Sequence, residues 1–293
     1  MSSIIIGCGQ VGRQLCSLLS DSNDTFHCIV KSQSSLEKIT QQKFSGLVFD
    51  LDAEQPFPDD ISPSGSDLYY FAPPSNDDLC DHRIDHFLKL CETAIPRRIV
   101  YISTSGVYGD CSGKWVNEEY PISPITDRAK RRAYAEQSLI SFCQKFKCEY
   151  NILRVGGIYG PERLPLERLK SITVVCPEEA PFSNRIHAFD LASVCLATMQ
   201  SKTHDEIFNV SDGNPTSMTD YFYQLADMAN LPRPPCVPLS EAASKLSPGM
   251  LSFINESRRL CTDKLNSMID VTVKFPTLDL GLKDCFKSVA KDV

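Results

Sequence analysis

Three glycines near the start of the chain have the spacing of a phosphate-binding turn. Residues 7–12 follow the pattern Gly-x-Gly-x-x-Gly. Such a turn lets the backbone approach the pyrophosphate of a dinucleotide, and the helix that begins there offers free N–H groups and the positive end of its dipole. The pattern is common by itself, so the neighbouring elements decide its meaning. We expect the whole turn to contact a cofactor, through Gly7, Cys8, Gly9, Gln10, Val11 and Gly12.

The segments on both sides of this turn fit a dinucleotide-binding unit. Residues 4–6 are all isoleucine, a short apolar run typical of a strand buried on both faces. After the turn, apolar residues recur at the spacing of one helix face, at Val11, Leu15, Leu18 and Leu19. The order strand, glycine turn, helix predicts cofactor binding. The alternative is a turn of the same fold that has lost its ligand.

The residues after the second predicted strand indicate which nucleotide binds. Sites for NAD(H) usually place a carboxylate there for the ribose 2′-hydroxyl, whereas a basic residue accommodates the 2′-phosphate of NADP(H). Here Lys31 and Ser32 follow the strand, and the first carboxylate is Glu37. We therefore expect Lys31 and Ser32 to contact the cofactor and NADP to be preferred, with NAD as the alternative. The simpler alternative for Lys31 is a solvated loop lysine.

Strands and helices alternate along the chain. Segments typical of strands span residues 4–6, 26–30, 46–50, 67–72, 98–103, 150–155 and 207–210, and helical patterns span 78–91, 127–146 and 219–229. This alternation predicts an α/β fold with a doubly wound parallel sheet, the Rossmann arrangement. Ligands of such sheets bind at the carboxyl ends of the strands. After the third and fourth strands we therefore expect further cofactor contacts, from Asp50, Leu51, Ala72 and Pro73.

The composition is that of an ordinary globular protein. The chain has 293 residues, 42% of them hydrophobic and 23% charged, with a net charge of −7. This charge argues against a nucleic-acid or anionic membrane partner, and no apolar run approaches the ~20 residues of a membrane span. The N-terminus lacks the pattern of a signal peptide. The 13 cysteines form no C-x-x-C pair and no Cys/His cluster, so we expect free thiols in a reducing cytoplasm and no metal site.

Several later segments resemble the motifs of a known family. They are residues 101–109 (YISTSGVYG), 153–161 (LRVGGIYGP), 185–192 (RIHAFDLA), 208–210 (FNV), 255–259 (NESRR) and 264–265 (KL). Their order is similar to that in the extended short-chain dehydrogenases/reductases, the NAD(P)-dependent epimerase/dehydratase family. The resemblance implies an NAD(P)-binding Rossmann domain over residues 1–160, to which 184–212 return. It also implies a smaller, interleaved substrate lobe formed by 161–183 and 213–293.

The chain departs from the family pattern at the active site. The family uses a Ser/Thr with a Tyr-x-x-x-Lys on the next helix, which usually carries a glutamate four residues after the lysine. Thr104 matches the Ser/Thr and Glu136 the glutamate, so Arg132 takes the place of the lysine and Arg128 that of the tyrosine. The resemblance is therefore to an atypical subgroup. An arginine stays protonated and cannot exchange a proton as a tyrosine beside a lysine does.

Four residues are candidates for catalysis, namely Thr104, Tyr108, Arg128 and Arg132. Arg132 can take over the electrostatic and ribose-binding role of the lysine, which also makes it a cofactor contact. Arg128 and Arg132 lie four residues apart, hence on one helix face, where they favour an anionic ligand. Lys130 and Arg131 are expected on the opposite, solvated face. Tyr108 is a substitute proton donor or, alternatively, a packing residue.

Two classes of function remain open. One is an NADP(H)-dependent oxidoreductase or epimerase with an altered active site, acting on a small substrate that is anionic or sugar-like. The other is a non-catalytic NADP(H)-binding sensor or scaffold protein. Retention of the nucleotide turn without the tyrosine fits both.

A homodimer is the expected assembly. Related enzymes pair through the helices that flank the fourth and fifth strands, here within 75–91 and 127–146. An apolar seam would supply the affinity, formed by Phe87, Leu88, Leu139 and Phe142. An acidic rim would face the basic helix across the two-fold axis, formed by Asp77, Asp78, Asp81 and Asp85. The alternative is that the apolar residues pack inward and the protein is a monomer.

Overall fold

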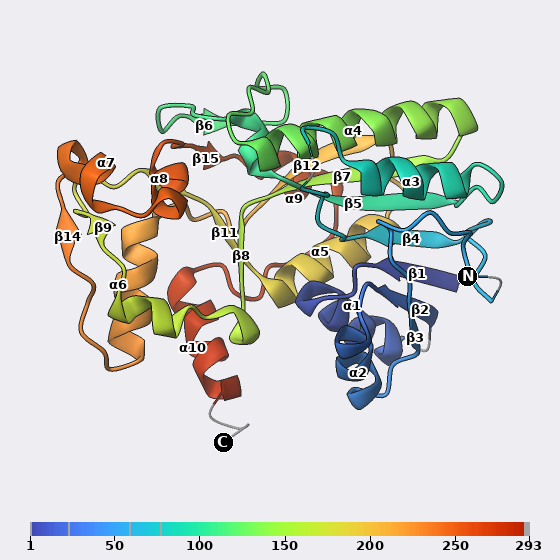
Figure 1. Cartoon of the computed structure of the whole chain (residues 1–293), viewed down its shortest axis with the longest axis horizontal. Coiled ribbons are helices and arrows are strands. Elements are labelled where there is room, and N and C mark those ends of the chain that lie inside the picture. Colours follow the sequence, from blue (N-terminus) through green and yellow to red (C-terminus); the bar gives the residue numbers. More distant parts are fainter. Residues whose placement is uncertain (1, 23, 59, 77, 290–293) are drawn as a thin grey trace.

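The computed structural model describes residues 2–22, 24–58, 60–76 and 78–289 and is built around one seven-stranded sheet (Figure 1). Neighbouring strands of this sheet run parallel. Their order is β12 (Glu206–Val210), β7 (Glu149–Val155), β5 (Arg98–Thr104), β4 (Asp67–Tyr70), β1 (Ser2–Ile6), β2 (Thr25–Val30) and β3 (Gly46–Val48). The chain order reverses at β1, which has β2 on one side and β4 on the other. Dinucleotides bind at such switch points.

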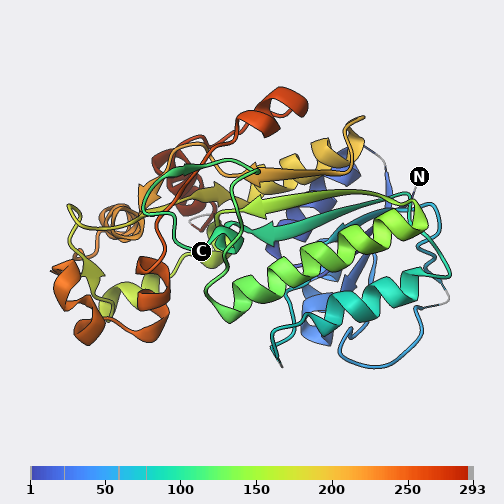
Figure 2. The same ribbon diagram turned by 90° about the horizontal axis from the view of Figure 1, so that it is seen from above.

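Helices cover both faces of the sheet (Figure 2). One face carries α3 (His82–Cys91) and α4 (Asp127–Phe146), and the other carries α1 (Gln10–Asp21), α2 (Gln33–Gln41) and α5 (Ala188–Gln200). The side chains of β1 alternate between the two layers. Ile5 joins the core with α1 and α5, whereas Ile4 and Ile6 join the core with α3 and α4. Because both faces are buried, β1 is apolar throughout, and the predicted doubly wound parallel sheet is confirmed.

Helix α4 has the predicted bounds and connects the sheet to the catalytic candidates. Its first turn is capped by Thr126, whose side chain accepts a hydrogen bond from the N–H of Ala129. Further along, Glu136 points to the sheet and forms a buried ion pair of 2.8 Å with Arg154 of β7. Helix α3 begins at His82, later than predicted, because the Asp81 carboxylate accepts from the N–H groups of Arg83 and Ile84.

A second lobe stands beyond the carboxyl ends of the strands (Figure 1). Its short strands pair as β8 (Gly157–Tyr159) with β11 (Arg185–His187), β9 (Val174–Val175) with β14 (Cys236–Val237), β10 (Phe182–Ser183) with β13 (Thr216–Ser217), and β6 (Trp115–Val116) with β15 (Arg259–Leu260). Its helices are α6 (Met218–Met228), α7 (Ala242–Lys245), α8 (Pro248–Ile254), α9 (Asp263–Met268) and α10 (Leu278–Val289). Residues 169–285 contribute most of a separate apolar core here. Leu265 and Ile269, however, pack into the core of the sheet, so the lobes interleave. None of the helices in the described ranges is long and apolar enough to cross a membrane.

The residues expected to form a dimer seam pack inside the subunit. Phe87 and Leu139 are fully buried, and Leu88 and Phe142 are 6% exposed, all in the core with α3 and α4. The expectation that they form a surface seam is wrong, because the sheet already covers them. Arg131 is likewise buried rather than solvated, because it donates to the backbone oxygen of Asp78 at 2.8 Å.

The expected acidic rim is also incomplete. Asp81 is fully buried as the cap of α3, and Asp77 lies outside the described residues. The structure therefore leaves Asp78 and Asp85 of the expected rim at the surface.

The Glu136–Arg154 pair predicts a large effect on stability. We expect Glu136→Ala to lower the free energy of unfolding by about 3–5 kcal/mol, because Arg154 is left as a buried charge without its carboxylate. Urea denaturation measures this difference. The matched control is Glu92→Ala, which removes an exposed ion pair with Lys145 at 3.4 Å and should cost less than about 1 kcal/mol. Similar small losses in both variants would contradict the prediction.

Candidate functional site

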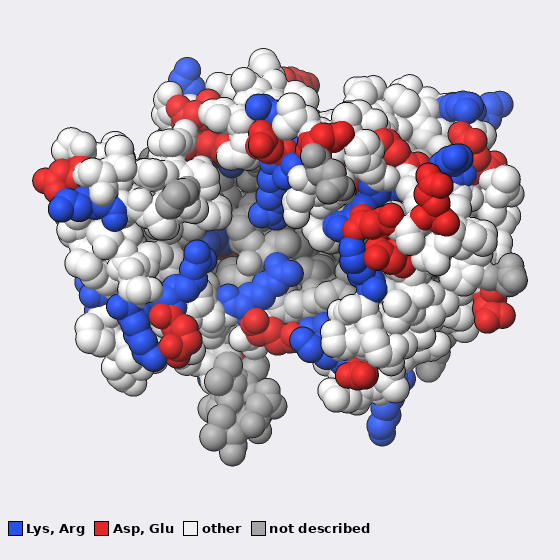
Figure 3. Space-filling view, in the orientation of Figure 1, with Lys and Arg blue, Asp and Glu red and all other residues white. Residues whose placement is uncertain are grey.

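A cleft of about 490 Å³ opens between the sheet and the second lobe (Figure 3). Its sheet-side wall comes from the β1–α1 turn, the end of β5 and the first turns of α4. The opposite wall comes from residues 156–185, from α6 and from residues 253–258. The residues that line the cleft include Gly7, Gly9, Gln10, Val11, Gly12, Pro73, Thr104, Arg128, Arg132, Arg163, Arg168, Arg185, Tyr221, Phe253, Glu256 and Arg258.

The glycine turn has the geometry of a phosphate cradle. Gly7 has a φ of +81°, and a Cβ atom there would lie 2.5 Å from the backbone nitrogen of Ala72 at the end of β4. Helix α1 starts from Gly9 with no capping side chain, so the N–H groups of its first turn remain available to a ligand. The buried Gln10 side chain lines the cleft with both amide atoms unpartnered. These features fit a bound pyrophosphate.

The structure places the side chain of Cys8 away from the cleft. It is 2% exposed, and its sulfur lies 3.7 Å from that of Cys16, which in turn is 3.2 Å from the Cys28 sulfur. The expectation that Cys8 contacts the cofactor is therefore limited to its backbone. In the described part of the chain, these three thiols are the one group of at least three ligand-type side chains close enough to share an ion. Sequence analysis found no such cluster, because α1 and β2 bring the cysteines together from separations of 8 and 12 residues.

The charged residues after β2 and β3 form a network outside the cleft walls. Lys31 forms ion pairs with Asp50, at 3.3 Å, and with Asp52. Arg83 binds both oxygens of Asp52, and this contact holds the pKa of that carboxyl well below its usual range. Lys31 is thus exposed but held by carboxylates, rather than a freely solvated lysine. Leu51 is buried, and its backbone oxygen contacts the His86 ring.

Hydroxyl groups surround the start of α2. Ser32 caps the helix by accepting from the N–H of Ser35, and its oxygen lies 3.1 Å from the Ser34 hydroxyl. The sequence-predicted contacts Lys31 and Ser32 are therefore adjacent in space to a helix N-terminus and two further hydroxyls.

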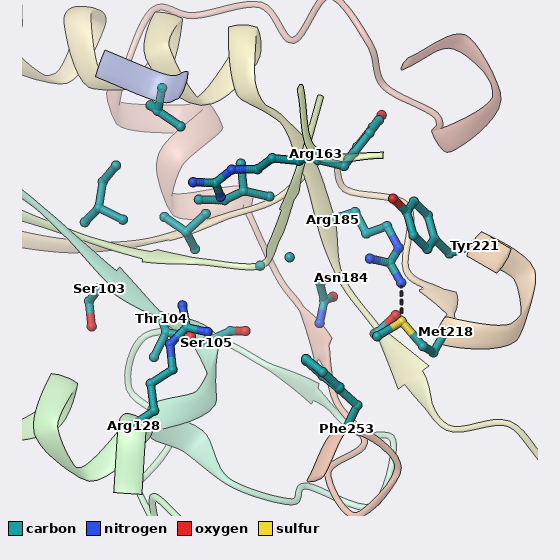
Figure 4. Close-up of a pocket in the computed structure, with 18 of the residues that line it drawn as sticks. Ser103, Thr104, Ser105, Arg128, Arg163, Asn184, Arg185, Met218, Tyr221 and Phe253 are labelled. Atoms are coloured by element: carbon teal, nitrogen blue, oxygen red, sulfur yellow. Dashed lines mark hydrogen bonds between the residues drawn. The ribbon is translucent and has the colours of Figure 1, made fainter. Parts of the chain in front are cut away.

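The structure brings both predicted arginines of α4 to the cleft together with Thr104. Arg132 is 5% exposed and donates to the Tyr101 hydroxyl at 2.9 Å and to the backbone oxygen of Ala72. Its Nε has no hydrogen-bond partner among the described residues. Arg128 reaches into the open cleft beside Thr104 (Figure 4). Partial loss of solvent and the charges of Arg132 and Arg163 lower the pKa of Arg128.

Tyr108 does not occupy a catalytic position, which corrects the expectation of a substitute proton donor. It is 1% exposed and does not line the cleft. Its hydroxyl donates to Asn209 at 2.7 Å and accepts from Arg154 at 3.1 Å. Burial raises the pKa of Tyr108 to about 12. Tyr108 is therefore a packing residue, which was the alternative in the sequence analysis.

Sequence analysis missed four arginines that complete the wall of the cleft, Arg163, Arg168, Arg185 and Arg258. Arg185 is buried against the Tyr221 ring at 4.0 Å, and Arg163 lines the same cleft (Figure 4). Arg258 pairs with Glu256, the one acidic residue among the described lining residues. With Arg128 and Arg132 the cleft holds six arginines. Arg128 and Arg132 share a face of α4, whereas the other four lie outside this helix and no local pattern in the sequence connects them with it.

Comparison with known proteins indicates which family the chain is similar to. Residues 75–211 match the model of the NAD dependent epimerase/dehydratase family. The chain is thus similar to this family over nearly half of its length. Human dTDP-D-glucose 4,6-dehydratase is 24% identical over 140 residues, which cover 45% of this chain and 40% of the human protein. A putative UDP-glucose 4-epimerase of Methanocaldococcus jannaschii is 26% identical over 43% of this chain and 45% of its own length.

Two solved structures resemble the chain over its whole length. A functionally unknown conserved protein from Silicibacter pomeroyi has a TM-score of 0.81 and 26% identity, over 98% of both chains. UDP-glucuronic acid 4-epimerase from Bacillus cereus, in complex with UDP-glucuronic acid and NAD, has a TM-score of 0.77 and 17% identity over the full length of both. The second likeness is one of fold.

Asp212 is a buried carboxyl beside Arg185 of the cleft wall, and its surroundings predict a pH-dependent contribution to stability. Asp212 is 7% exposed, accepts from the N–H of Asn214 with one oxygen, and has no partner for the other. Burial raises the pKa of Asp212 to about 7, although the charge of Arg185 opposes the rise. The folded state therefore holds this proton more tightly than the unfolded state, so stability falls as the pH rises from about 4 to 7.

We expect Asp212→Asn to remove this loss. Its free energy of unfolding relative to that of the wild type should rise between pH 4 and pH 8 by up to about 4 kcal/mol, at about 1.4 kcal/mol per pKa unit. Denaturant titrations at several pH values measure the difference. The control is Asp279→Asn at an exposed carboxylate, which should give a flat difference. A flat difference for Asp212→Asn as well would show that Asp212 is not the titrating group.

Proposed function

We propose that the chain is an NADP(H)-dependent oxidoreductase or epimerase that acts on a small anionic or sugar-like substrate. The observation that carries the proposal is a single cleft in which a glycine turn meets a wall of arginines. The turn suits the pyrophosphate of the cofactor, and the arginines suit the negative charge of the substrate. The curated relatives match over less than half of their length, so their substrates indicate a chemical class only.

The cofactor would lie across the switch point of the sheet. Gly7, Gly9 and the first turn of α1 would hold the pyrophosphate, and Ala72 and Pro73 lie beside the turn at the end of β4. Lys31 and the hydroxyls around Ser32 would hold a 2′-phosphate. Because Asp50 and Asp52 already bind Lys31, that phosphate must compete with two carboxylates. A preference for NADP(H) is thus expected to be moderate rather than absolute.

Replacement of Lys31 tests the choice of nucleotide. We expect the wild type to bind NADPH more tightly than NADH, and Lys31→Ala to lose about tenfold in NADPH affinity, equal to about 1.4 kcal/mol, with little change for NADH. Isothermal titration calorimetry measures both. Gly7→Ala is the control for the shared turn. Its Cβ would overlap the Ala72 backbone and should lower the affinity for both nucleotides. Equal affinities of the wild type for the two nucleotides would reject NADP(H) preference.

The arginines explain how the substrate could be bound and activated without the usual tyrosine. The nicotinamide, when bound, supplies hydride chemistry. Arg128 remains charged and can stabilise negative charge that develops on a substrate oxygen, and the Thr104 hydroxyl lies on the same wall. Arg132 is fixed by Tyr101 and the Ala72 carbonyl and would position the ribose side of the cofactor.

A second candidate function is a non-catalytic NADP(H)-binding sensor or scaffold. The observation that favours it is the position of Tyr108, whose hydroxyl is bound by Asn209 and Arg154 away from the cleft. Helix α4 offers arginines where the family pattern has a tyrosine and a lysine. A chain that binds the nucleotide and leaves the substrate unchanged would have the same features.

Substitution of Arg128 distinguishes the two candidates. We expect the wild type to oxidise NADPH when a carbonyl compound that bears a carboxylate, or a sugar nucleotide, is supplied as substrate. The loss of absorbance at 340 nm measures this oxidation. Arg128→Gln should lower kcat/KM for the anionic substrate by about 10- to 100-fold, because a charge-assisted contact contributes about 1.5–3 kcal/mol. The control Lys130→Gln removes an exposed charge of the same helix.

The same assay has an outcome that supports the second candidate. If the wild type consumes no NADPH with any member of the panel but Arg128→Tyr does, the native chain is a binding protein. Comparable loss in Lys130→Gln and Arg128→Gln would remove the specific role of Arg128.

A further inference from the structure

Two cysteines from distant parts of the chain meet at the surface of the second lobe. The sulfur of Cys176 lies 2.7 Å from that of Cys236, although 60 residues separate them. This distance is shorter than ordinary contact between two sulfur atoms, although a disulfide bond is shorter still, at ~2.05 Å. We propose that Cys176 and Cys236 are a redox-modification site, in which a reversible disulfide fastens the segment of β9 to that of β14.

The backbone holds the two residues in position for this bond. Strands β9 and β14 run parallel, with Cys236 paired to Val174. The N–H of Cys176 donates to the backbone oxygen of Val237 at 2.9 Å, and that of Val174 donates to Pro235 at 3.0 Å. These hydrogen bonds fix both Cα positions independently of the sulfurs. With both strands held in this way, the two sulfurs face each other at 2.7 Å.

The pair is also the most accessible thiol pair among the described residues. Nine of the thirteen cysteines are buried, whereas Cys236 is exposed and Cys176 partly exposed. The other close sulfurs, those of Cys8, Cys16 and Cys28 and those of Cys143 and Cys148, are buried in the core. A dissolved oxidant can thus reach Cys236 directly but not the buried group.

Disulfide formation takes two steps, and the arrangement of the thiols sets their order. The hydrogen bond that Cys176 donates to Cys236 raises the pKa of Cys176 to about 11, and Cys236 is the more exposed of the two, so Cys236 is the sulfur that reacts first with a dissolved reagent. Its thiolate attacks one sulfur of a low-molecular-weight disulfide, breaks that bond and expels one thiolate. Cys176 then loses its proton to solvent, attacks the Cys236 sulfur and expels the second thiolate. The protein loses two hydrogens, and the reagent disulfide is reduced to two thiols.

The bond would affect the lobe that forms one wall of the cleft. Val175 of β9 accepts a hydrogen bond of 2.6 Å from Thr219 in the first turn of α6, and Tyr221 and Phe222 of the same helix line the cleft. A covalent link between β9 and β14 would restrict the movement of β9, which contacts the first turn of this helix. The inference does not depend on the proposed function, because it concerns the thiols alone.

The experiment is a redox titration of the full-length protein. The chain is equilibrated with mixtures of reduced and oxidised glutathione, quenched with acid and alkylated, and its peptides are mapped without reduction. We expect a peptide pair linked through Cys176 and Cys236 that disappears with dithiothreitol. Closing a 60-residue loop should also raise the melting temperature of the oxidised wild type by roughly 5–10 °C.

Three variants make the result specific. Cys236→Ser and Cys176→Ser should each abolish both the linked peptide and the rise in melting temperature. Cys261→Ser, at another partly exposed cysteine, should leave both unchanged. Circular dichroism of the reduced variants checks that each is folded. The proposal is overturned if both cysteines stay fully alkylated in oxidised glutathione, or if Cys236 links to another cysteine or another chain.

Discussion

The close approach of the β1–α1 turn to the end of β4 is the constraint on which the rest of the site depends. At Gly7 the backbone passes so near Ala72 that a single Cβ atom would overlap it. This contact lies at β1, where the strand order of the sheet reverses. It orients the first turn of α1 toward the cleft at the carboxyl ends of β1 and β4. It also fixes Ala72, whose carbonyl holds Arg132. One glycine thus sets the position of the phosphate cradle and of the arginine beside it.

The charge of the arginines is the second organising feature. Their counter-charges differ between the two sides of the cleft. On the sheet side, Arg154 is neutralised by Glu136, and Arg132 is buried on Tyr101 with one nitrogen unpartnered. On the lobe side, Arg185 is buried against Tyr221 and has no carboxylate within ion-pair distance among the described residues. Several arginines therefore lack a counter-charge, which an anionic ligand would supply.

Helix α4 connects stability with the candidate chemistry. Its middle turns anchor it to β7 through Glu136 and to the core through Leu139, and its first turns present Arg128 and Arg132 to the cleft. Because α4 is anchored in this way, its arginines are held in position by the fold itself. The same burial explains why Phe87, Leu88, Leu139 and Phe142 are not available as a dimer seam.

Local patterns in the sequence determined the sheet, α4 and the glycine turn, because each depends on residues within one segment. The apolar run of residues 4–6, the glycine spacing and the four-residue separation of Arg128 and Arg132 are signals of this kind. Helices α2, α8, α9 and α10 were not predicted, since they are short or depend on tertiary packing for stability.

Tertiary structure alone decided which side chains share the cleft and which are withdrawn from it. Arg163, Arg185 and Arg258 come together only when separate segments fold over the sheet, and the thiols of Cys176 and Cys236 meet across 60 residues. Tyr108 stands four residues after Thr104 but turns into the core, where Asn209 binds its hydroxyl. Sequence spacing describes neighbours along one element, whereas burial and partners depend on elements that approach from elsewhere in the chain.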